Sequence, residues 1–115
     1  MPLEWDEARK ILATVRAASE DDPKLQGLHR AWLLAAVRYA EARAEWHLAP
    51  REERLSKDRH RTQLHDAFID SCNALSRNLA QQDKDVEWRR GLGSDRKTIG
   101  DLACYLHCLL GLEAR

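Results

Sequence analysis

Residue types that interrupt or cross-link a chain are scarce in this sequence. It holds three prolines, five glycines and three cysteines among 115 residues. The cysteines Cys72, Cys104 and Cys108 form no CxxC pair, and this argues against both a disulfide scaffold and a structural zinc site. We therefore expect all three to be buried as small apolar side chains in a reducing compartment.

Net charge and long apolar runs are also absent. The 19 basic and 19 acidic side chains cancel, so no overall field attracts nucleic acid or an anionic membrane surface. No apolar run reaches the length of a membrane span, and the acidic start MPLEWDEARK does not resemble a signal peptide. We therefore expect a cytoplasmic protein with no membrane partner, for which nucleic acid is a poor partner and any anion site is a local cluster of cations.

Apolar residues recur at helical spacing, and no segment alternates cleanly as a β-strand would. The pattern predicts helices over about 3–18, 23–47, 58–81 and 95–110, with Asp22 as the N-cap of the second. From residue 51 to 61 only Leu55 is apolar, which predicts either a helical or a frayed connector. The predicted fold class is all-α: residues 1–115 form a single-domain bundle of about four main helices with a long helical hairpin. The last of these helices is apolar almost all round and is expected at the centre.

The stretch HDAFIDSCNALSR, residues 65–77, places polar side chains on one face of the third predicted helix. At about 100° per residue, four of them form a column that points away from the core: Asp66, Asp70, Asn73 and Arg77. Opposed charges on an exposed face contribute little to stability. This polar column is therefore either a solvated helix face or one wall of a binding site.

A second polar cluster lies in WRRGLGSDRK, residues 88–97. Its cations Arg89, Arg90, Arg96 and Lys97 flank a glycine turn that leads into the last predicted helix. Free N–H groups and the helix dipole favour an anion at such a helix start. The stretch lacks the GxxxxGK[ST] pattern of a P-loop, so it predicts either a different anion site or a plain charged turn.

Both clusters belong to a pattern that resembles small uncharacterised bacterial helical proteins, of the kind classed as domains of unknown function. The pattern reads H-[ND]-A-F-I-D-x-x-N-x-L-x-R, then W-R, then D-R-K-x-I-G-D-x-A-C-Y, and residues 65–77, 88–89 and 95–105 match it. The resemblance covers about the C-terminal half of the chain. It implies that the two clusters form one module, and it implies no activity.

The leading hypothesis from the sequence is a binding module for a small anionic ligand, phosphorylated or nucleotide-like. In this interpretation cationic side chains hold the phosphate, Asp70 and Asn73 orient the rest of the ligand, and Trp88 stacks on a base. The predicted ligand-binding residues are Asp66, Asp70, Asn73, Arg77, Trp88, Arg89, Arg96, Lys97 and Tyr105. No motif identifies a cofactor.

Two enzymatic alternatives remain open. Arg59 and His65 are separated by five residues, which resembles the R-x(4-6)-H motif of HEPN ribonucleases, a family of small all-α dimers that use this pair on RNA. A second alternative is a metal-dependent phosphohydrolase, loosely similar in composition to the all-α NTP pyrophosphatases of the MazG type. Its candidate magnesium ligands are Glu41, Glu45, Asp66 and Asp70.

A third hypothesis is a protein-interaction module. The second predicted helix is long and amphipathic, and an antitoxin-like or phage-type regulator would use such a helix to bind its partner. Under each of these hypotheses we expect that the chain can self-associate as a homodimer, because a helical hairpin buries an exposed apolar stripe readily against a copy of itself.

Overall fold

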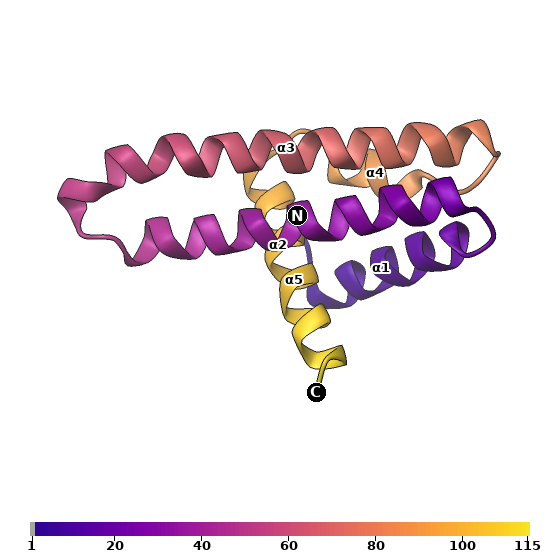
Figure 1. The fold of residues 1–115 in the computed structure, drawn as a ribbon, viewed down its shortest axis with the longest axis horizontal. Coiled ribbons are helices and arrows are strands. Elements are labelled where there is room, and N and C mark those ends of the chain that lie inside the picture. The colour runs from indigo at the N-terminus through magenta and orange to yellow at the C-terminus, as the bar shows by residue number, and fades with distance from the viewer. Residues whose placement is uncertain (1) are drawn as a thin grey trace.

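The computed structural model describes residues 2–115 as one all-α domain (Figure 1). These residues form four longer α-helices, one short α-helix and one turn of 3-10 helix, which confirms the predicted fold class and its long hairpin. The elements are α1 (Trp5–Ser19), α2 (Pro23–Leu48), η1 (Arg51–Glu53), α3 (Arg54–Gln81), α4 (Glu87–Leu92) and α5 (Arg96–Glu113).

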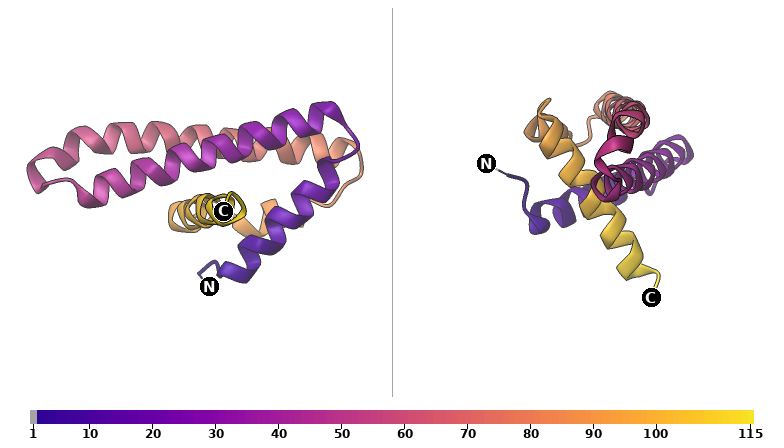
Figure 2. Two further views of the ribbon diagram at one scale, coloured as in Figure 1. Left: turned by 60° about the horizontal axis from the view of Figure 1, so that its bottom comes forward. Right: turned by 90° about the vertical axis from the view of Figure 1, so that its left-hand side faces the viewer.

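Helices α2 and α3 form an antiparallel hairpin along the long axis of the molecule (Figure 1). Helix α2 starts as predicted: the Asp22 side chain accepts hydrogen bonds from the backbone N–H groups of Lys24 and Leu25, and Pro23 occupies the first position. The inner faces of the two helices bury Trp32 and Phe68. Helices α1 and α4 cover one half of this hairpin, and the half that carries the turn projects beyond them (Figures 1 and 2).

The connector of residues 51–61 is helical, since α3 begins at Arg54, four residues before the predicted start. The physical reason is Trp46 at the end of α2. The guanidinium carbons of Arg61 and Arg54 lie 4.0 and 5.1 Å from the centroid of its indole ring. Arginines that stack on an aromatic ring replace apolar side chains as the packing partner, so a count of apolar residues underestimates the helix.

The sequence predicted that the last helix lies at the centre of the bundle, and this prediction is wrong for α5. It crosses the hairpin at a steep angle (Figure 2), and only its first turns are buried, through Ile99, Leu102 and Leu106. At Gly100 a Cβ atom would lie 2.7 Å from Cζ of Arg43, so α2 and α5 are in close contact there. Beyond this crossing α5 leaves the core, and Leu112 is 56% exposed.

The same geometry corrects the expectation for the cysteines. Cys72 on α3 is buried, and its Sγ accepts a hydrogen bond from the indole N–H of Trp32 at 3.3 Å. Cys104 is half-buried on α5, and Cys108 is exposed because it lies where α5 leaves the core.

Candidate functional site

The structure brings the polar column and the α4–α5 segment into direct contact. Arg89 of α4 donates from Nε to Oδ1 of Asn73 at 2.9 Å, and from Nη1 to the backbone oxygen of Gly93 at 2.9 Å. Arg96, at the start of α5, donates to Oγ1 of Thr62 on the same face of α3, also at 2.9 Å. Thr62 and Asn73 are about three helical turns apart. The segment from α4 to α5 therefore crosses from one to the other along the polar column.

These contacts within the chain use many of the hydrogen-bonding groups that were predicted to bind a ligand. Arg89 is half-buried and bonded twice within the chain. Lys97 donates to Oδ2 of Asp101 at 2.9 Å, and this hydrogen bond raises the pKa of the lysine. Asp101 also faces Arg43 of α2 at 3.5 Å. Arg89 and Arg96 thus tie α4 and the start of α5 to α3, whereas Lys97 is bonded within α5 and Arg90 to Glu87 within α4.

Two of the residues predicted as ligand contacts, Trp88 and Tyr105, take part in packing between helices. Trp88 is buried against Trp32, with ring centroids 5.6 Å apart, which leaves little of its ring for a nucleobase. Tyr105 is half-buried; its hydroxyl donates to the backbone oxygen of Leu3 at 3.2 Å, and its ring meets Trp5 edge-on at 5.5 Å. Both aromatic side chains hold the packing of the N-terminal segment, α4 and α5.

Three members of the polar column are exposed, namely Asp66, Asp70 and Arg77. Asp66 lies 3.1 Å from Nδ1 of His65. Within residues 2–115, neither Asp70 nor Arg77 takes part in a side-chain hydrogen bond or an ion pair. The column is therefore braced at Asn73 and open to solvent on either side of it.

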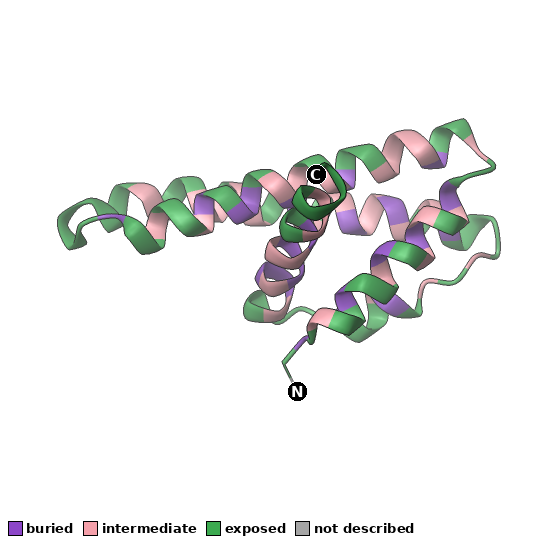
Figure 3. Ribbon diagram, turned by 90° about the horizontal axis from the view of Figure 1, so that it is seen from below, coloured by how far each residue is buried: buried purple, intermediate pink, exposed green. Residues whose placement is uncertain are grey.

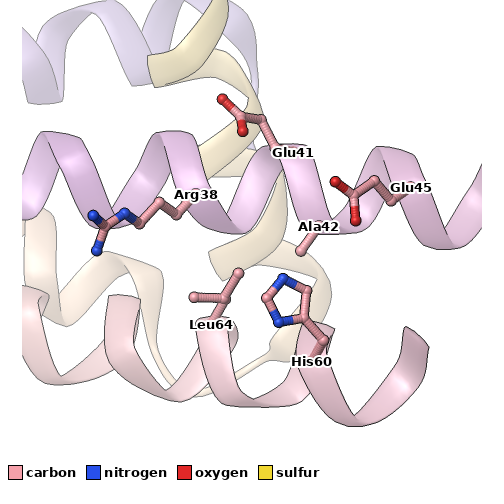
Figure 4. A pocket seen from close by; sticks show the side chains of 6 residues that line it. All are labelled: Arg38, Glu41, Ala42, Glu45, His60 and Leu64. Atoms are coloured by element: carbon pink, nitrogen blue, oxygen red, sulfur yellow. The ribbon is translucent and has the colours of Figure 1, made fainter. Parts of the chain in front are cut away.

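The predicted carboxylate cluster does not form. Glu41 and Glu45 line a hollow of about 350 Å³ between α2 and α3, where they lie near His60 and Leu64 (Figure 4). The register of the hairpin explains this, because Trp46 lies against Arg61 and Tyr39 against His65, while Asp66 and Asp70 project from the other side of α3. In Figure 4 the Glu41 carboxylate points away from the imidazole ring of His60. Within the described part of the chain, no three His, Cys, Asp or Glu side chains gather closely enough to hold a metal ion.

Arg59 and His65, the candidate ribonuclease pair, point in different directions. Six positions along a helix correspond to about 120° around its axis and 9 Å along it. Arg59 is exposed and lines an outer hollow, whereas the His65 ring is half-buried edge-on against Tyr39, with centroids 5.3 Å apart. This chain alone therefore does not assemble the two side chains around one substrate bond.

The end of the hairpin holds a feature that the sequence did not single out as a site. Leu48 and Leu55 lie on either side of the turn and are 84% and 85% exposed. Leu55 lines a hollow of about 620 Å³ together with Ser56, Asp58 and Arg59. We call residues 46–61 the hairpin tip. Most of this region is exposed or half-buried in Figure 3. The available signal was Leu55 itself, a single leucine among charged residues.

Comparisons of the chain with models of protein families, with curated proteins and with solved structures find no match. Among the helices of residues 2–115, none is both long and apolar enough to cross a bilayer.

Proposed function

We propose that this protein is a protein-interaction module that binds its partner through the projecting hairpin. The observation that carries the proposal is the exposure of Leu48 and Leu55, 84% and 85%, at the end of a hairpin that extends beyond the other helices. A single exposed leucine is ordinary. Here two exposed leucines lie in one short region at the far end of the molecule, which measures 48 × 29 × 29 Å. Their apolar area adds nothing to the core at this position.

The surroundings of these leucines have the composition of a contact surface. Arg51 and Arg59 are exposed near them, as are the carboxylates of Glu52 and Glu53. Protein interfaces commonly combine a few apolar anchors with a charged rim, in which the rim sets orientation and the anchors provide most of the affinity. A partner helix with an apolar stripe and charges of both signs fits this surface.

The proposal is tested by capture of partners from a lysate of the source cells with the full chain as bait. We expect Leu48→Asp and Leu55→Asp each to reduce the recovery of a specific partner at least about tenfold, because a buried charge without a counterion weakens an interface strongly. Leu112→Asp is the matched control, since Leu112 is also exposed but lies on α5. Equal recovery by all three variants, with unchanged thermal midpoints, would contradict the proposal.

A small anionic ligand at the polar column is a second candidate function. One observation favours it: Arg89 and Arg96 reach α3 on the face from which Arg77 projects into solvent. Three guanidinium groups along one helix face suit phosphate or carboxylate groups, which arginine binds through paired hydrogen bonds.

This second function is tested by thermal shift against inorganic phosphate, nucleotides and cyclic dinucleotides. A ligand at one hundred times its dissociation constant stabilises the folded state by about 2.7 kcal/mol, which raises the midpoint by more than about 5 °C in a domain of this size. We expect Arg77→Ala to abolish the shift, whereas Arg9→Ala on α1 retains it. A panel without any shift would exclude these ligands from the polar column.

A further inference from the structure

The outer face of α2, opposite its buried side, carries a heptad stripe. Leu34, Glu41 and Leu48 recur every seven residues, and Val37 and Ala44 lie between them at the spacing of a coiled-coil seam. Leu34 is 51% and Leu48 84% exposed, and Ala44 is exposed as well. The buried residues of α2, among them Trp32 and Tyr39, belong to the other side of the helix. Four of the five seam positions are therefore apolar on the side that the core does not use.

Charges along one edge of this stripe indicate which helix can pack on it. Arg38 and Glu45 are both exposed and are separated by one heptad (Figure 4). When two copies of α2 pair antiparallel about an axis near residues 41 and 42, Arg38 of each copy lies opposite Glu45 of the other. In a parallel pair this edge of one copy and the same edge of the other would lie on opposite sides of the seam, so Arg38 and Glu45 would not meet. The charge pattern is therefore complementary to itself in the antiparallel orientation alone.

We infer that α2 pairs antiparallel with α2 of a second copy through Leu34, Val37, Glu41, Ala44 and Leu48, so that the protein forms a homodimer. The inference goes beyond the proposed function, because it adds a second copy as the partner of the α2 stripe and leaves Leu55 of the hairpin tip free for a different protein. An interface built on one helix pair buries less than about 1,200 Å², the range of weak and transient complexes, and we expect a dissociation constant on the order of micromolar. Glu41 lies near its own copy at the axis and opposes association by like-charge repulsion.

A charge-exchange experiment on the full chain tests this pairing by sedimentation velocity over a roughly hundredfold range of concentration. Arg38→Glu and Glu45→Arg each replace two attractive pairs in the dimer by two repulsive ones, so each weakens association about tenfold or more. The double variant R38E/E45R restores the opposite charges and returns the dissociation constant to within about threefold of the original. Glu41→Leu strengthens the dimer about tenfold. Arg9→Glu, the same charge change on α1, leaves it unchanged.

A chain that stays monomeric across this range, or a dimer insensitive to both single exchanges, would overturn the inference. The variant Leu55→Asp separates it from the proposed function. Leu55 lies on α3, outside the α2 stripe, so the homodimer should persist in this variant while capture of a different protein is lost. If the wild-type protein is monomeric and the Leu55→Asp variant loses the captured partner, only the α2 pairing is refuted. A dimer that obeys the charge exchange, with capture unaffected by Leu55→Asp, would refute only the role of the hairpin tip.

Discussion

The replacement of Trp32 by alanine is expected to lower the free energy of unfolding by about 3–5 kcal/mol, a large part of the stability of a domain of this size. Trp32 is fully buried where α2, α3 and α4 meet. Its ring packs on Trp88, and its indole N–H donates to Cys72. The alanine variant therefore loses buried apolar area, creates a cavity and removes the donor to the thiol. Denaturation with urea, followed by circular dichroism, measures the change.

Two variants control this experiment. Trp32→Phe keeps most of the ring and loses only the hydrogen bond and some volume, so we expect a smaller loss of about 1–2 kcal/mol. Trp46→Ala removes the same side chain from the half-buried hairpin tip, where the ring is covered by arginines. If Trp46→Ala were as damaging as Trp32→Ala, the core would not lie where α2, α3 and α4 meet.

Much of the fold could be predicted because its signals are local. The Asp22–Pro23 pair marks the start of α2 through a cap that depends on adjacent residues only. The errors arose where packing depends on distant partners. Arg54 and Arg61 extend α3 by stacking on Trp46, and this contact requires the hairpin to be formed first. The exposed end of α5 follows from a crossing angle, which hydrophobic periodicity along one helix does not contain.

The sequence predicted which two stretches meet at the candidate site, but it did not predict the contacts between their side chains. The sequence resemblance implied that residues 65–77 and 88–97 form one module, and the hydrogen bond from Arg89 to Asn73 joins the two stretches. The role of Trp88 was not predictable from its arginine neighbours alone. A signal existed, however: Trp88 and Leu92 are large apolar residues four positions apart, which places them on one face of a helix. Both are buried in the structure, so this face of α4 belongs to the core.

The carboxylate hypothesis failed for a different reason. Which residues of α2 lie opposite which residues of α3 depends on the length and path of the turn at residues 49–53. A difference of one helical turn in this register, or a different rotation of α3, changes which carboxylates meet. Neither quantity can be read from the spacing of residues within one helix.

Stability should also fall as the pH rises above 9, and Cys72 provides a test of this. Burial raises the pKa of the Cys72 thiol from 9.0 to about 11, more than the indole N–H of Trp32 and the charge of Arg89 lower it. Between these two values the unfolded chain loses the thiol proton and the folded chain retains it. The unfolded state then binds fewer protons, so the free energy of unfolding decreases with pH by up to about 1.4 kcal/mol per unit.

The thiol contribution can be separated from other groups that titrate in this range by comparison with Cys72→Ala. We expect the wild-type protein to lose about 2 kcal/mol more than the variant between about pH 8 and pH 10.5, measured by urea denaturation at each pH. The alanine variant starts from a lower stability because it leaves a small cavity, but only the pH dependence reports the buried proton. Cys104→Ala is the matched control, since that thiol is half-buried on α5 beside Arg43. Parallel pH profiles for wild type and Cys72→Ala would show that the thiol between α2 and α3 is accessible to water, and the packing of Trp32 on Cys72 would then be wrong.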